Sequence, residues 1–270
     1  MWKYTKMQKI FLNLFATFFL FVCLFILPNK TQASLVSKSP TNTLTSGLVG
    51  YWTFDGKDTN WATNKTNDLS GNGNTGTMTS MSTTTSPAPG KLGQAFNFDG
   101  VDDYVQSGIL GDAVMTENGA LTISAWIKPK SLGQNGEGNI VARDGSTAGP
   151  NFLVLSTNRL RFLVMGGTAL YRYASNNSLT LNTWQHVVVT WDGSLNSSNI
   201  HFYVNGSLKD SATKQDGVNL TDNSSSILYI GNRGDVTKKR TFDGSLDDVR
   251  IYNRALSATE VRQLYNLGQV

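Results

Sequence analysis

Residues 121–127 read LTISAWI, and this stretch decides the fold class. Apolar side chains at Leu121, Ile123 and Ile127 alternate with small or polar ones. Successive side chains of a β-strand point to opposite faces of a sheet, so the alternation predicts a strand with one buried face.

Similar short stretches recur along the chain, separated by Gly, Asn, Asp and Ser. They include residues 159–164 (RLRFLV), 184–191 (WQHVVVTW), 200–204 (IHFYV) and 227–230 (ILYI). Repeated strands at roughly 10–15-residue spacing indicate a β-sandwich or barrel. Asn205-Gly206 predicts a two-residue hairpin turn, because both residues tolerate positive φ. Only one helix is predicted: Ser257 to Glu260 form a capping box, and Gly268 ends the helix. The fold class is therefore all-β with one short C-terminal helix.

The first 33 residues differ from the rest of the chain. Lys3, Lys6 and Lys9 precede an apolar run at residues 10–27, and small residues lie before Ser34. This layout predicts a secretory signal peptide that is cleaved after Ala33. Without cleavage, the run is long enough to act as an N-terminal membrane anchor. Residues 34–46 are polar and without periodicity, which predicts a linker before a folded domain at residues 47–268.

Composition narrows the class of partner. Four lysines lie in the leader, and without them the 23 basic residues fall to 19, equal to the 19 acidic residues. Since nucleic-acid binding needs an excess of positive charge, nucleic acid is a poor candidate. The sole cysteine, Cys23, also lies in the leader. The mature chain must therefore fold without disulfides, and its length allows a core large enough for one β domain.

The sequence Phe-Asp-Gly occurs three times, at Phe54, Phe98 and Phe242, and the last two copies are followed by paired aspartates. Each glycine is expected to serve a turn. Alternate residues of a strand share a face, so in the final copy Asp247 is expected on the apolar face together with Val249, and Asp248 on the solvent face. The same alternation places Asp103 on the apolar face. A carboxylate on an apolar face is costly unless it is hydrogen-bonded, paired or bound to a cation.

Six segments, in order, resemble the LamG-like jellyroll domains of the concanavalin A-like lectin and glucanase superfamily. They are GLVGYWTFDG, DLSGNGNTGTM, GKLGQAFNFDGVDDYV, LTISAWIKP, TWQHVVVTWDG with FYVNG, and FDGSLDDVRIYNRALSATEV, which together span roughly residues 47–267. The resemblance implies two packed antiparallel sheets in a jellyroll sandwich whose first and last strands are neighbours. It also implies a secreted or cell-surface protein.

The residues of a catalytic site are missing from the sequence. Glucanases of this superfamily carry E-x-D-x-x-E on one strand, whereas this chain has three scattered glutamates, Glu117, Glu137 and Glu260. Paired aspartates do not replace that motif, because adjacent strand residues point to opposite faces. His186 and His201 lie in apolar strand sequence without a G-x-S-x-G turn, which favours buried structural roles. We therefore expect no enzymatic activity.

Two interpretations of the inward aspartates stay open. Either they accept backbone hydrogen bonds or pair with arginine, or they hold a structural calcium ion, which takes six to eight hard oxygen ligands. Calcium sites are frequent among the proteins that this chain resembles. If the first and last strands are neighbours, the candidate ligands are Asp55, Asp68, Asn72, Asn74 and Asp247.

Polar loops and an i, i+2 tyrosine pair supply the candidate ligand-binding residues. Sugar sites combine aromatic rings with amide, carboxylate and guanidinium groups, and the candidates here are Trp61, Tyr171, Tyr173, Asn176, Asn177 and Arg233. Trp61 could be an ordinary exposed aromatic, and the tyrosines could be cross-strand packing partners.

Three functions follow from these residues and the resemblance. The first is a secreted, non-catalytic module that recognises a carbohydrate or mediates adhesion at a cell surface. The second is a protein-interaction or surface-display scaffold without a sugar site. The third is a glycoside-active enzyme. The expected partner is a glycan or a cell-surface protein, with no contact to a membrane beyond the signal segment.

Overall fold

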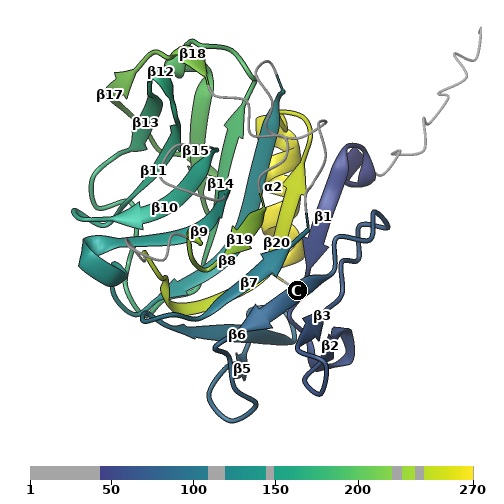
Figure 1. The fold of residues 1–270 in the computed structure, drawn as a ribbon. Helices are drawn as coiled ribbons and strands as arrows, with labels where there is room; N and C mark the ends of the chain where they lie inside the picture. Colours follow the sequence, from purple (N-terminus) through teal and green to yellow (C-terminus); the bar gives the residue numbers. More distant parts are fainter. Residues whose placement is uncertain (1–42, 109–118, 144–148, 221–226, 235–239, 270) are drawn as a thin grey trace, which may run out of the picture. The chain divides into compact units, whose positions relative to one another are not determined.

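The computed structural model describes residues 43–108, 119–143, 149–220, 227–234 and 240–269, which belong to the compact unit Asn42–Val270. The predicted signal peptide (residues 1–33) lies outside the described residues. Two large antiparallel sheets enclose one main apolar core, as the fold class predicted (Figure 1). Among the described residues, no helix has the length and apolar character needed to cross a membrane.

Sheet A contains the first and last long strands of the domain. Its order is β16 (Ser207–Leu208), β15 (Ile200–Val204), β14 (Gln185–Trp191), β8 (Leu121–Pro129), β20 (Asp243–Tyr252), β6 (Gln94–Asp99) and β5 (Pro87–Pro89), and β1 (Leu48–Trp52) also pairs with β20. One edge of β20 is shared: β6 pairs with its first half and β1 with its second half. The neighbouring first and last strands implied by the family resemblance are confirmed.

Sheet B has ten strands and faces sheet A across the core. Its order is β17 (Asp210–Gln215), β13 (Leu170–Ala174), β11 (Arg159–Val164), β10 (Asn151–Leu155), β9 (Glu137–Arg143), β19 (Leu228–Ile230), β7 (Tyr104–Ser107), β4 (Gly76–Thr79), β3 (Lys65–Thr66) and β2 (Thr59–Asn60). A separate two-stranded sheet pairs β12 (Gly166–Thr168) with β18 (Val218–Leu220). Four short 3₁₀ helices complete the described connections: η1 (Thr43–Thr45), η2 (Gly56–Asp58), η3 (Gln134–Gly136) and η4 (Ser197–Asn199).

The alternation read from the sequence sorts side chains between the two faces of each sheet. In β8, Leu121, Ile123 and Ile127 enter the main core, whereas Trp126 lies on the other face of sheet A. In β11, Leu160, Phe162 and Val164 are buried in the main core, so Arg159 and Arg161 lie on the outward face of sheet B. Each fully buried aliphatic or aromatic side chain contributes about 1.5–3 kcal/mol of transfer free energy, so this core dominates stability.

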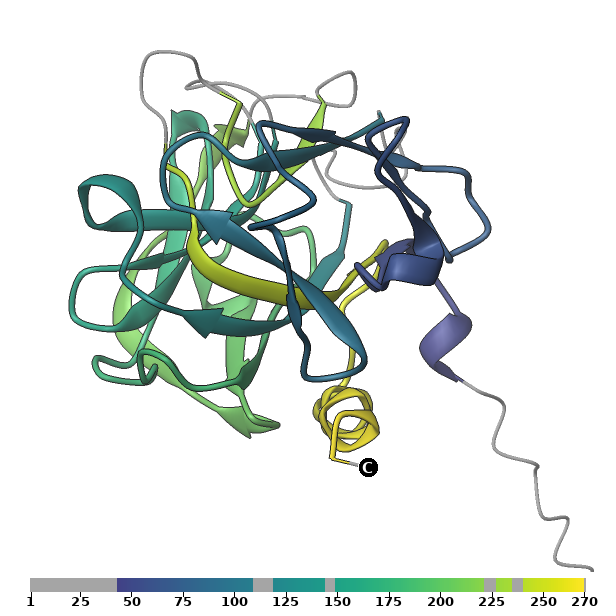
Figure 2. The same cartoon turned by 90° about the horizontal axis from the view of Figure 1, so that it is seen from below.

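Helix α2 (Ala258–Leu267) covers part of the outer face of sheet A, and Figure 2 views it nearly along its axis. Val261 and Leu264 pack there in a second apolar cluster with Tyr252. The predicted capping box is present, because the Ser257 and Glu260 side chains each accept a hydrogen bond from the other residue's backbone N–H. Gly268 ends the helix with φ −88°, so its lack of a side chain serves a close approach instead of a left-handed turn. A Cβ there would lie 2.3 Å from the Trp126 ring.

A β-bulge at Asp248 overturns the predicted faces of the aspartate pair. Asp248 has φ 53°, and the pairing of β20 with β8 shifts between Asp247 and Arg250. The extra residue puts Leu246 in the main core together with Val249, so Asp247 lies opposite Trp126 on the outer face. The prediction that Asp247 shares the face of Val249 is wrong, because simple alternation does not survive a bulge.

Two of three smaller predictions also need correction. The last residues of the predicted linker (34–46) are folded: η1 begins at Thr43, and Leu44 packs against the cluster under α2. Gly244 does not form a turn but lies inside β20, where a Cβ would be 2.3 Å from the carbonyl oxygen of Lys128. The predicted Asn205-Gly206 turn is confirmed, with φ values of 51° and 71° between β15 and β16.

Candidate functional site

Three of the predicted calcium ligands form a hydrogen-bonded loop beside β1. Asp68 accepts bonds from the backbone N–H groups of Tyr51 (2.9 Å), Ser70 (2.8 Å) and Asn74 (2.9 Å). The side-chain amides of Asn72 and Asn74 donate to two carbonyl groups of β1, at 3.0 and 2.7 Å. The contacts of this loop therefore fasten it to the first strand, and its carboxylate oxygens are already engaged.

The other two predicted ligands hold the turn between β5 and β6. Asp247 Oδ2 accepts the backbone N–H groups of Lys91 and Leu92, both at 2.8 Å. Asp55 Oδ1 accepts the backbone N–H of Gln94 at 2.7 Å. Asp247 thus binds the turn from the last strand, and Asp55 binds it from the segment that follows the first strand.

Burial strongly perturbs the carboxyl group of Asp247. Its side chain is 0% exposed, and its Oδ1 atom has no hydrogen-bond partner. Loss of solvation raises its pKa to about 7; the two backbone donors oppose the shift, and the nearby Asp248 and Asp55 charges add to it. Asp247 is therefore a group that changes charge near neutral pH.

Asp248 and Arg250 are buried as well, contrary to the predicted solvent face. Arg250 donates to Asp248 Oδ1 and to the Tyr51 hydroxyl, both at 3.0 Å, and its guanidinium lies 4.3 Å from the Tyr51 ring centre. Burial raises the pKa of Tyr51 to about 12. A buried ion pair of this kind, with its remaining groups satisfied, fixes the joint between β1 and β20.

The two histidines have different environments. His186 is buried, shares a 2.8 Å hydrogen bond with Ser124 Oγ, and has a pKa lowered to about 3 by burial. The prediction that His201 is buried is wrong, because its side chain is 42% exposed and contacts Asp210 at 2.7 Å. Of the three glutamates, Glu137 contacts Arg240, Glu260 pairs with Arg254, and Glu117 lies outside the described residues.

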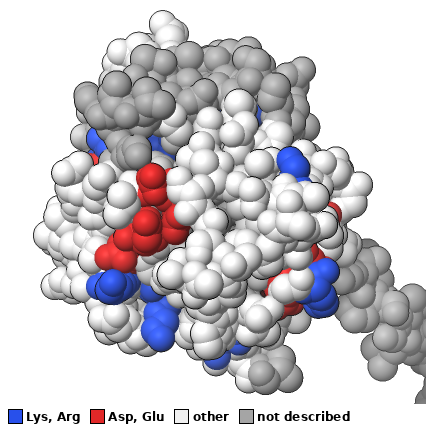
Figure 3. Space-filling view, turned by 60° about the horizontal axis from the view of Figure 1, so that its bottom comes forward, with Lys and Arg blue, Asp and Glu red and all other residues white. Residues whose placement is uncertain are grey.

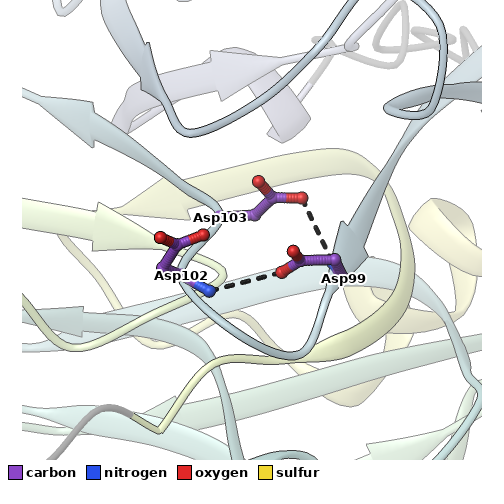
Figure 4. Close-up of side chains that lie close together, drawn as sticks. All are labelled: Asp99, Asp102 and Asp103. Atoms are coloured by element: carbon purple, nitrogen blue, oxygen red, sulfur yellow. Dashed lines mark hydrogen bonds between the residues drawn. The ribbon is translucent and has the colours of Figure 1, made fainter.

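A carboxylate cluster that the sequence analysis did not select lies at the β6–β7 turn. Asp99, Asp102 and Asp103 bring ligand atoms within 4.8 Å of one another, and no other such group of three occurs in the described part of the chain (Figure 4). The backbone N–H of Asp99 donates to Asp103 (3.1 Å), and those of Val101 and Asp102 donate to Asp99. Burial, reinforced by the Asp99 charge, raises the pKa of Asp103 to about 6. Figure 3 shows acidic side chains gathered on this side of the molecule.

These contacts do not fit a calcium ion at the predicted set of residues. Asp55, Asp68 and Asp247 are not brought into one such group in the described structure, and each accepts backbone hydrogen bonds. The geometry matches the alternative interpretation, in which the aspartates lock neighbouring loops. Calcium binding by the protein stays a prediction.

The tyrosine pair lies on the outward face of sheet B. Tyr171 and Tyr173 are partly exposed, and their ring centres are 5.6 Å apart in an edge-on arrangement. Tyr173 is paired with Arg161 of β11, and the Arg159 guanidinium lies 4.2 Å from the Tyr173 ring centre. The result is an aromatic surface of two edge-on rings with a cation against one of them, termed here the tyrosine face (Tyr171, Tyr173, Arg159 and Arg161).

Two of the predicted asparagines lie beside this surface. The Thr157 hydroxyl is 3.3 Å from Asn176 Oδ1, and the Asn177 backbone N–H donates to the Thr157 carbonyl at 2.8 Å. Thr157 belongs to the turn that leads into Arg159, so both asparagines border the tyrosine face.

Trp61 and Arg233 lie away from it. The Trp61 ring packs against the main core with its centre 5.4 Å from that of Phe96, near β2 at the other end of sheet B. Arg233 follows β19 and is only 6% exposed. The structure therefore does not unite the six predicted ligand-binding residues in one site.

Sequence reasoning missed Arg159 and Arg161 as site residues. The signal was present, because the alternation in RLRFLV sets both arginines opposite the buried leucine, phenylalanine and valine. What the sequence did not show is that β13 pairs with β11 and so brings the tyrosines to the arginines. The same face also holds Asn139 and Asn151, whose side chains are almost fully buried and whose Oδ1 atoms have no partner.

The sequence model of a family described as the concanavalin A-like lectin/glucanases superfamily matches residues 99–262. The chain belongs to this superfamily. Among curated proteins, the chain is similar to Adhesion G-protein coupled receptor V1 of Danio rerio, with 26% identity over 153 residues. That match covers 54% of the chain but 2% of the receptor, so the chain spans a very small part of this relative's length.

Solved structures also share the fold of this chain. Domain 4 of AbnA, an extracellular arabinanase of Geobacillus stearothermophilus solved with arabinotriose, is 20% identical, with a TM-score of 0.61. The alignment covers 82% of this chain and 98% of that domain. The binding domain of Paraclostridial Mosquitocidal Protein 1 is 21% identical, with a TM-score of 0.59 over 83% of this chain and 53% of the other. At such identities the likeness establishes the fold.

Proposed function

We propose that this chain is a secreted, non-catalytic module that recognises a carbohydrate through the tyrosine face. The observation that carries the proposal is the aromatic pair Tyr171 and Tyr173 on the outward face of a rigid sheet, bordered by arginine and asparagine side chains. An aromatic ring offers an apolar face that packs against the C–H groups of a sugar, and nearby polar groups can bind its hydroxyls.

Two further observations support a binding role. The site lies on regular strands, which hold side chains more rigidly than loops do, and β-sheet rigidity reduces the entropy lost on binding. A domain of the same fold has been solved with arabinotriose, an oligosaccharide. The predicted signal peptide and the adhesion-receptor relative support a location outside the cell, at or near a surface.

A glycan array probed with the purified chain tests the proposal. We expect binding to a subset of glycans, loss of at least tenfold in affinity for Tyr171→Ala, and little change for Trp61→Ala, whose ring packs on Phe96 instead of bordering the face. Thermal melting of each variant checks that it is folded. A blank array for the wild-type chain would refute carbohydrate recognition and favour the protein-interaction scaffold. Glycan cleavage by the purified chain would refute the non-catalytic assignment.

A further inference from the structure

The tyrosine face carries positive charge that nearby acids do not neutralise. Arg161 lies 3.6 Å from Glu137, and Arg240 contacts that same carboxylate, so two arginines share one acid. Arg159 forms no ion pair with any described carboxylate, and its Nε atom is without a hydrogen-bond partner. The face therefore presents at least one guanidinium whose charge is left for a ligand.

Packing holds this guanidinium in place. The Arg159 guanidinium stacks on the Tyr173 ring at 4.2 Å, and such a cation–π contact restrains the side chain. The Nε atom of this guanidinium is buried, so the two terminal nitrogens are the donors available to a ligand. Because an ordered guanidinium loses little freedom on binding, its fork suits bidentate contact with a carboxylate.

The sheet pairing places both tyrosines on the same face as Arg161. Arg161 pairs with Tyr173, and Leu163 with Tyr171, so the two tyrosines and Arg161 lie in successive cross-strand positions on one face. A sugar ring stacked on one tyrosine would hold a substituent within reach of the arginines.

From this geometry we propose that the glycan recognised by the tyrosine face is acidic, namely a polysaccharide whose sugar rings carry carboxylate groups. This inference rests on the proposed carbohydrate function and narrows its ligand class. Arg159 supplies the principal contact to the carboxylate, Arg161 a weaker one because Glu137 competes for it, and the tyrosines supply the stacking surface.

The test compares polygalacturonate with its fully methyl-esterified form, in which each carboxylate becomes an uncharged methyl ester; both are titrated into the full chain. We expect polygalacturonate to bind at least tenfold more tightly, with an affinity that falls as salt rises. Arg159→Gln should lose at least tenfold on polygalacturonate and a clearly smaller factor on the ester. Arg262→Gln removes an equally basic but exposed side chain from α2, on sheet A, and should change neither.

Other outcomes separate the inference from the function on which it rests. Equal binding of the ester and the acid, or equal losses for Arg159→Gln and Arg262→Gln, overturns the acidic-glycan inference but keeps carbohydrate recognition. Tighter binding of dextran sulfate than of polygalacturonate also overturns it, because the charged group would then be a sulfate. Failure to bind any glycan on the array overturns both. Melting curves of the two variants verify that each is folded.

Discussion

At the scale of single residues, Asp247 combines a structural contact with a charge that changes near neutral pH. Its ordinary pKa of 3.8 rises to about 7 in the folded protein, so between about pH 4 and pH 7 the folded state binds more protons than the unfolded state. The free energy of unfolding therefore falls as pH rises through this window and levels off above it. Asp103, with a pKa of about 6, adds to the same trend.

Replacing Asp247 separates its hydrogen bonds from its charge. Asp247→Asn keeps an oxygen that can accept the Lys91 and Leu92 N–H groups, so we expect a flatter pH dependence and unchanged or higher stability at pH 7. Asp247→Ala leaves both donors without an acceptor and should cost about 1–3 kcal/mol. Urea unfolding from pH 4 to pH 8 measures both effects. An Asn variant with the wild-type slope would contradict the assignment of this titration to Asp247.

At the scale of elements, the β6–β7 turn places the carboxylates of Asp99, Asp102 and Asp103 close together. Asp99→Asn keeps the turn, because an asparagine oxygen can accept the Val101 and Asp102 N–H groups that Asp99 now accepts. Removing the charge should lower the pKa of Asp103 and raise the melting temperature by a few degrees at pH 7. Thermal melting in EDTA measures this.

The same variant tests the calcium prediction. Because the predicted ligands are engaged in hydrogen bonds, we expect the wild-type melting temperature to be the same in EDTA and in millimolar calcium. A calcium-dependent rise in the wild type that disappears in Asp99→Asn would contradict this expectation and assign the ion to the turn. A calcium-dependent rise in melting temperature that persists in Asp99→Asn but is lost in Asp68→Asn would instead assign the ion to the loop beside β1.

Elements were predictable wherever local chemistry alone decides them. The capping box at Ser257, the Asn205-Gly206 turn and the alternation of β8 each depend on a few neighbouring residues, and each is confirmed. The bulge at Asp248 was not predictable, because it forms where β6 ends and β1 begins along the same edge of β20. That junction forms only after distant strands have paired, so the alternation of residues 246–252 does not predict the bulge.

At the scale of the whole molecule, the sequence predicted the fold, but it predicted only the tyrosines of the candidate site. Tyr171 and Tyr173 could be found from their i, i+2 spacing, but Arg159 joins them only through the pairing of β11 with β13. The resemblance supplied the neighbouring first and last strands, which no local pattern contains. A site spread over several strands depends on sheet order, and sheet order is set by the packing of the entire core.

Closure of sheet A by β1 should therefore be essential to the entire domain. β1 pairs with residues 249–252 of β20 and contributes Trp52, which is 0% exposed in the main core. Loss of a buried tryptophan alone costs about 3–5 kcal/mol, against a total stability of about 5–15 kcal/mol for a typical domain. A chain that begins at Thr53 would lose this ring, the hydrogen bonds of β1 and the Tyr51 contact to Arg250 together.

We expect that chain to be insoluble or to melt without cooperativity, whereas a chain that begins at Asn42 should melt as the longer protein does. Circular dichroism melts of both truncations make the comparison, and a cooperative transition in the chain beginning at Thr53, within a few degrees of the other, would show that the domain is held together without its first strand.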